Sequence, residues 1–400
     1  MPKQFDLTTL GLGTGEYSIQ VKAKASGYKD SPLSNSVQYT VAQQGWTFGV
    51  SGLTNSNPTL TRTDDSVGYT WTKNSTSGII TTDFDTIFNF EEVTDSNGNV
   101  FIRIPKMYYK RTADTIQLSD HSQTGFACHP LFLNESGQEM NYFDVGKYKG
   151  SYGNSELHSY VNATPNGLDI AMFRDGAREN NDYDNAAYQY QIGDLRYLSW
   201  LWMFWMVVFA TRQTEDVMGT TWYEYSNATT GNTNNLVNNN LTYPKSICGQ
   251  DPTTHSFKLF GIEDVVGAGW EFVDGVSFNN ANVYYSLQPS KYINEATSST
   301  TGYQTLGYTR ATATGGWIVS MGLDANQPAI MLPNNVNGGS TSTYYCDYNS
   351  NYAANKINSL FFGSAFAFNN TYGIFYFNGS FLFSDTTDYT RSRLMRQLRG

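Results

Sequence analysis

The chain has 400 residues; 40% are hydrophobic, only 15% are charged, and the formal net charge is −10. This length predicts two or three domains, and the charged fraction is below the usual 25% or so. A nucleic-acid-binding surface needs clustered Lys and Arg. The visible cluster is four arginines near the chain end, which we expect to be solvated or locally paired: Arg391, Arg393, Arg396 and Arg399. Nucleic acid is therefore not an expected partner.

The longest apolar run, Trp200 to Ala210, is too short for membrane insertion, because a spanning helix needs about 20 residues. It predicts a buried core helix over 200–212, capped by the hydroxyl of Ser199. The first residues lack the apolar stretch of a signal peptide. The chain has three widely spaced cysteines, which do not form a disulfide framework: Cys128, Cys248 and Cys346. We expect assembly in a reducing cytoplasm.

In chain order, residues 1–43 predict a β-hairpin, because apolar residues alternate with polar ones around Tyr17 and again around Tyr39. This segment resembles the last two strands of a fibronectin type III or immunoglobulin-like domain. A lone hairpin is marginal in water, so it is expected to need a neighbour.

Residues 44–126 predict a β-rich segment with long loops, in which 100–104 is the clearest strand. Turn residues 95–98 precede this strand, and Pro105 ends it. Residues 127–400 are mixed: a short helix is expected over 169–178, and short strands between polar loops beyond 240.

Residues 261–275 carry the most specific motif, GIEDVVGAGWEFVDG. It resembles G-L-x-D-M-x-G-N-V-W-E-W, a signature shared by formylglycine-generating enzymes and the variable proteins of diversity-generating retroelements. Ala268 and Gly269 replace the Asn-Val pair. The resemblance implies an α+β fold, with a C-type-lectin-like (formylglycine-generating-enzyme-like) domain over 127–400 behind β-rich N-terminal segments. Trp270 is then expected in the core.

Residues 362–394 resemble the variable region of major tropism determinant-like proteins, with the pattern G-G-x-W-x-x-G-x-x-A-G ending in I-G-x-R-L. Here the corresponding stretches are GSAFAFNNTYG and TRSRL. Adenine-directed rewriting of Asn codons cannot produce Lys, Glu, Gln, Met or Trp, and 361–392 contains none of these five. An ordinary aromatic hairpin would often show the same composition.

The resemblance places ligand contacts at family positions that vary, and alternation in extended backbone would put each set on one face. The expected ligand-binding residues are Ala365, Ala367, Phe368, Thr371, Ser380, Phe381, Phe383, Asp385, Thr387 and Tyr389. Phe375 and Phe377 are expected in the core. The alternative is that the phenylalanines simply fill the core; alanine substitution would then cost about 3–5 kcal/mol of stability.

Catalysis is not expected. A formylglycine-generating oxidoreductase needs paired cysteines, and Cys346 has no second cysteine near it in sequence. The Cys128–His129 pair lacks two further zinc ligands, and no nucleophile–base set is apparent. Four acids could form catalytic pairs, although turns and the motif explain them more simply: Asp182, Asp184, Asp264 and Asp274. No cofactor or metal is expected. An oxidoreductase or a plain carbohydrate-binding lectin remains the alternative.

The resemblance therefore predicts a receptor-binding protein of a phage tail tip, or alternatively of a bacterial cell surface. Its expected partners are a bacterial cell-surface protein or glycan, other tail-fibre subunits, and two further copies of itself in a homotrimer.

Overall fold

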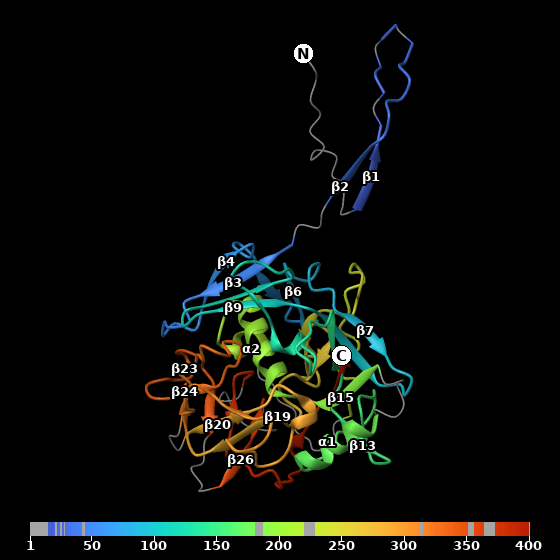
Figure 1. Ribbon diagram of the computed structural model, residues 1–400. Helices are drawn as coiled ribbons and strands as arrows, with labels where there is room; N and C mark the ends of the chain where they lie inside the picture. Colours follow the sequence, from blue (N-terminus) through green and yellow to red (C-terminus); the bar gives the residue numbers. More distant parts are fainter. Residues whose placement is uncertain are drawn as a thin grey trace. The chain divides into compact units, whose positions relative to one another are not determined.

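Figure 1 shows the computed structural model of the chain, which divides into two compact units, Met1–Trp46 and Thr47–Gly400. The structure describes residues 15–20, 22–24, 26–27, 29–41, 45–180, 187–219, 229–311, 315–350, 356–363 and 373–399. In the first unit, β1 (Gly15–Ile19) and β2 (Val37–Val41) pair antiparallel. The predicted hairpin is therefore confirmed.

The second unit is built from sheets, and the fold-class prediction of α+β is wrong. Strands make up 33% of the described residues and helices 11%. The described residues contain three α-helices: α1 (Ile170–Glu179), α2 (Leu195–Phe209) and α3 (Thr214–Met218). The physical reason is that only a few of the buried apolar residues outside α2 lie in helices, whereas the others lie in short strands and in the loops between them. The protein is a β-rich fold.

Two five-stranded sheets contain most of the N-terminal strands of this unit. One has the order β11 (Ala127–Cys128), β9 (Tyr108–Arg111), β10 (Thr115–Ser119), β3 (Thr47–Ser51), β4 (Thr61–Asp64). The other has the order β15 (Tyr188–Ile192), β29 (Leu394–Leu398), β12 (Tyr142–Gly146), β8 (Val100–Pro105), β7 (Glu91–Thr94). In the second sheet, β29 therefore lies between β12 and β15 and pairs with both. The predicted strand ending at Pro105 is confirmed.

The largest sheet carries the C-terminal half. Its order is β21 (Gln304–Thr305), β20 (Asn282–Tyr285), β19 (Trp270–Asn279), β26 (Ile357–Phe362), β27 (Phe377–Asn378), β25 (Tyr348–Ser350), β22 (Gly316–Trp317). A further strand, β28 (Thr390–Arg391), runs parallel to β19 and pairs Trp270 with Thr390. Residues from both sequence motifs thus lie side by side.

The second unit also contains one more five-stranded sheet and two pairs of strands. A third five-stranded sheet has the order β18 (Ile262–Glu263), β17 (Phe257–Leu259), β16 (Cys248–Gln250), β6 (Ile79–Thr82), β5 (Trp71–Lys73). The two-stranded pairs are β13 (Ser151–Gly153) with β14 (Glu156–His158), and β23 (Ser320–Met321) with β24 (Pro333–Asn335). Single 3₁₀ turns lie at Pro130–Phe132 and Pro289–Lys291.

Helix α2 contacts β3 and β10 on one side and β19 on the other, and Figure 1 shows it in the middle of the unit. All fifteen of its residues are buried, as expected for a helix that is apolar all round. It begins at Leu195, earlier than predicted, because the Asp194 carboxylate accepts a hydrogen bond from the Tyr197 N–H and caps it. Ser199 lies inside the helix, where its hydroxyl accepts from the Met331 N–H.

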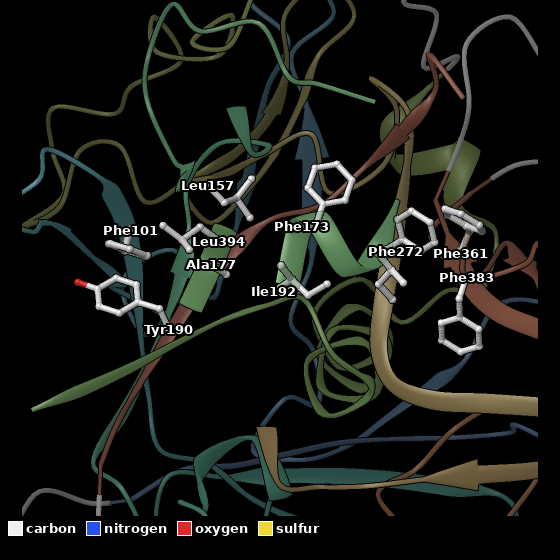
Figure 2. Close-up of a cluster of buried hydrophobic side chains, with 11 residues drawn as sticks. Phe101, Leu157, Phe173, Ala177, Tyr190, Ile192, Phe272, Phe361, Phe383 and Leu394 are labelled. Carbon is white, nitrogen blue, oxygen red and sulfur yellow. The ribbon is translucent and has the colours of Figure 1, made fainter. Parts of the chain in front are cut away.

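Helix α1 confirms the predicted short helix, with Asp169 as its cap. Its apolar face packs into a cluster of buried side chains that also includes the last strand of the chain. Figure 2 shows this cluster, with Phe272, Phe361 and Phe383 close together on one side of it. The cluster also contains Phe383 and Leu394, so the core holds the chain at both of these residues.

Candidate binding surface

The described parts of the expected variable region are 362–363 and 373–394. The residues just after 373 belong to the core, because Phe375 and Phe377 are buried, as predicted. The Asp347 carboxylate accepts a hydrogen bond from the Phe375 N–H at 2.9 Å, and the Ile374 carbonyl accepts one from the Trp202 indole at 2.6 Å. Four of the expected ligand residues lie outside the described residues: Ala365, Ala367, Phe368 and Thr371.

The other six expected ligand residues lie in one segment, Ser380–Tyr389, which we call the 380–389 loop. Two turns shape its backbone. The Asp385 carboxylate accepts from the Leu382 N–H at 2.8 Å, and the Thr387 hydroxyl accepts from the Tyr389 N–H at 3.1 Å. Side-chain oxygens that bond nearby backbone N–H groups stabilise such turns, so the loop has a defined conformation.

The loop is also fastened to the sheet. The Phe381 carbonyl accepts a hydrogen bond from the Ser359 N–H at 2.8 Å, and the Tyr389 carbonyl accepts one from the Trp270 N–H at 2.9 Å. The Ser380 carbonyl accepts from the Asn358 amide at 2.8 Å. Both ends of the 380–389 loop are therefore anchored to residues of β19 and β26.

Exposure differs sharply within the loop. Phe383 is 2% exposed and belongs to the core cluster, which corrects the expectation that it faces outward. Phe381 is half-buried, with ring centroids 5.4 Å from Trp270 and 4.8 Å from Phe361. Tyr389 is 45% exposed. The alternation argument was wrong for Phe383 because the backbone turns at 382–385 and does not run extended.

A semi-exposed aromatic surface results, made by Trp270, Phe381, Leu382 and Tyr389 with the polar residues Ser380, Asp385 and Thr387 around them. Trp270 is partly buried against the core cluster, so it supports the surface from β19. We call this set the 380–389 surface. Chemically it offers aromatic contact area with hydroxyl and carboxylate groups at its edge, which is typical of protein-binding patches.

A buried charge network lies behind this surface. Arg393 is 0% exposed and donates to the Glu271 carboxylate at 2.7 Å. Lys149 lies 3.3 Å from the same carboxylate oxygen and donates to the Gly269 carbonyl. Burial opposes the charge of Glu271, but Arg393 and then Lys149 outweigh it and lower its pKa. Glu271 and Arg393 come from the two sequence motifs, so the network joins them.

The expectation that the arginines of the chain end are solvated or locally paired is wrong for Arg393 and Arg396, which pair with distant acids, whereas Arg391 donates to the adjacent Thr390 carbonyl. Arg391 is buried, and Arg396 is buried against the Asp144 carboxylate at 2.9 Å; Arg399 is exposed. Sequence reasoning missed their partners because Asp144 and Glu271 lie more than 100 residues away along the chain.

The four candidate acids do not form a catalytic pair among the described residues. The Asp274 carboxylate makes a bidentate ion pair with Arg174 at 2.7 and 2.8 Å. Asp264 is buried, and burial followed by the neighbouring Glu263 carboxylate raises its pKa to about 7. Asp182 and Asp184 lie outside the described residues. Asp274 and Asp264 are therefore explained by ion pairing and by the motif's packing.

The thiols are poorly suited to nucleophilic chemistry. Burial raises the pKa of Cys128 and of Cys346 to about 12, and raises that of Cys248 well above its ordinary value. A thiol reacts as its thiolate, which is scarce at neutral pH under these conditions. Among the described residues no group of three His, Cys, Asp or Glu side chains could hold a metal ion.

His129 has a packing role. Its Nδ1 accepts a hydrogen bond from the Leu131 N–H at 3.2 Å and caps the Pro130–Phe132 turn. Burial, and then the charge of Arg196, lower the pKa of His129 from 6.5 to about 3. Between these values the unfolded chain binds a proton that the folded protein does not. The free energy of unfolding therefore decreases as the pH falls from 6.5 towards 3.

The variant His129→Asn tests this effect, because its amide oxygen can still cap the turn but carries no titrating proton. Between pH 6 and pH 4 we expect wild type to lose up to about 1.4 kcal/mol more stability per pH unit than the variant. Urea unfolding at pH 6, 5 and 4 measures the difference. Parallel pH dependences would show that His129 does not stay neutral in the fold.

A comparison of the sequence with models of known protein families finds no matching family, and no curated protein is significantly similar to the chain. No helix among the described residues is both long enough and apolar enough to cross a membrane.

Proposed function

We propose that the chain is a receptor-binding protein that contacts its target through the 380–389 surface. One observation carries this proposal: an exposed Tyr389 and a half-buried Phe381 sit on a loop whose backbone is anchored at both ends. Such a loop presents aromatic contact area at a small entropic cost. Its side chains can change without disturbing the strands that hold it.

The resemblance of 261–275 and 362–394 to variable proteins of diversity-generating retroelements supports the same proposal and suggests a phage tail tip as the setting. The target is then a bacterial cell-surface protein or glycan, and the chain assembles as a homotrimer with other tail-fibre subunits. The raised thiol pKa values argue against cysteine-based catalysis.

The test measures binding of fluorescently labelled protein to a panel of bacterial strains. We expect wild type to bind at least one strain, and Tyr389→Ala to weaken binding to that strain at least tenfold, because an exposed Tyr at an interface centre often contributes 2 kcal/mol or so. Its melting temperature should stay within the error of wild type.

The matched control is Val67→Ala, which shortens a 68% exposed apolar side chain in the turn after β4. It should bind like wild type. Equal binding by Tyr389→Ala and wild type would contradict the proposed contact surface. Failure of wild type to bind any strain of a broad panel would count against the receptor-binding function itself.

A further inference from the structure

A hollow of about 600 Å³ opens beside the β13–β14 hairpin, and its lining includes no residue of the 380–389 surface. Its wall combines aromatic rings with amide and carboxylate groups. The side chains that matter are Asn97, Tyr152, Asn154, Glu156, His158 and Tyr160. None of them takes part in the function proposed above.

The rings of this hollow are held in place by the fold. His158 and Tyr160 stack with centroids 4.4 Å apart and an interplanar angle of 8°. The Tyr160 hydroxyl donates to the Asn97 carbonyl at 2.9 Å. The Tyr152 ring packs so closely on α1 that a Cβ on Gly176 would lie 2.5 Å from it. Rings fixed in this way cost little further ordering when a ligand packs against them.

The polar groups are placed by a tight turn. Asn154 and Ser155 join β13 to β14 with φ values of 54° and 68°, which is the two-residue hairpin turn that favours Asn at its first position. The Asn154 side chain is exposed at the tip. Amide groups can donate and accept at once, so this wall offers both roles to a ligand.

The charge of the hollow selects against anions. Its lining residues include no Lys or Arg, whereas they include Glu156. Burial lowers the pKa of His158, so the imidazole is neutral at pH 7. Burial, and then the Asp95 and Glu156 carboxylates, raise the pKa of Tyr160. A negatively charged ligand would meet acidic groups here without a compensating cation.

We propose that this hollow binds a neutral pyranose unit, at a site separate from the 380–389 surface. A pyranose has an apolar C–H face that packs on an aromatic ring and hydroxyl groups around its edge. Those hydroxyls match the Asn154 amide and the Glu156 carboxylate, in the way that ligand sites combine apolar walls with a few polar groups. The proposal does not depend on the receptor-binding function.

The test is saturation-transfer NMR on the full chain with methyl α-D-glucopyranoside, methyl α-D-mannopyranoside and methyl β-D-galactopyranoside. At least one should receive saturation, with strongest transfer to the protons of one ring face. The methyl glucuronide, which adds a carboxylate to the same ring, should bind at least tenfold more weakly than the glucoside. No transfer to any of the three neutral glycosides would overturn the proposal.

Three variants locate the site. Asn154→Gly keeps the left-handed turn conformation, and it should weaken binding of the best glycoside about three- to tenfold, the effect of one hydrogen bond. Tyr160→Leu should weaken it at least tenfold. Glu156→Gln should remove the discrimination against the glucuronide. Tyr389→Ala should leave glycoside binding unchanged. Unchanged binding in all three hairpin variants would place the sugar elsewhere and overturn the proposal.

Discussion

Replacing Arg393 by Met is expected to lower the free energy of unfolding by about 3–5 kcal/mol, the effect of breaking a buried ion pair by removing one partner. Arg393 donates to the carbonyls of Gly146, Lys147, Glu263 and Asp264 as well as to the Glu271 carboxylate. The methionine keeps the apolar stem but leaves these acceptors unpaired.

Urea unfolding at pH 7 measures this loss. The control is Arg399→Met, which removes an exposed arginine six residues further along the chain. It should change stability by no more than about 0.5 kcal/mol. Similar stabilities for the two variants would show that the network behind the 380–389 surface does not stabilise the fold.

The second large effect concerns the loop itself. Phe383→Ala should cost about 3–5 kcal/mol of stability, as expected for a fully buried Phe, because this side chain packs in the cluster with Phe272 and Phe361 (Figure 2). Tyr389→Ala, six residues away, should cost no more than about 0.5 kcal/mol. Thermal unfolding of the two variants provides the comparison.

Phe381→Ala should fall between these two values, since its half-buried ring still contacts Trp270 and Phe361. A stable Phe383→Ala variant that loses binding would restore the first expectation that Phe383 contacts the ligand. A strongly destabilised Tyr389→Ala variant would instead show that Tyr389 contributes to the core.

Local elements were the most predictable part of the fold. Short-range signals explain three of these elements. A proline ends the strand before Pro105, and alternation of apolar and polar residues marks the hairpin around Tyr17 and Tyr39. A capping carboxylate, that of Asp169, begins helix α1. These signals act within one element, so they can be recognised without knowing the rest of the structure.

The start of α2 was mispredicted because its first turn contains polar residues. Arg196 interrupts the apolar pattern, yet it is buried through an ion pair with Asp194 at 2.7 Å. The Tyr292 hydroxyl donates to the same carboxylate from nearly 100 residues away. A partner so distant along the chain cannot be predicted from the local sequence pattern. The helix was therefore predicted to begin only at Trp200.

The fold-class prediction was wrong for a related reason. The resemblance implied an α+β fold, but the buried apolar residues outside α2 lie mainly in short strands and in the loops between them, and the strand pairing is non-local. Strand β29 at the chain end pairs with β12 and β15, which places Arg396 against Asp144. Within the candidate site, sequence reasoning correctly placed Phe375 and Phe377 in the core, whereas the turn at 382–385 reversed the orientation expected for Phe383.

The most direct test of the central claim is a hydrogen–deuterium exchange footprint of the protein bound to cell-envelope fragments of a strain that it recognises. The account predicts slower exchange in peptides covering the 380–389 loop and Trp270 than in the unbound protein. Peptides from the 61–73 region, which contains Val67, should be unchanged. Slower exchange confined to surfaces other than the 380–389 loop would contradict the account.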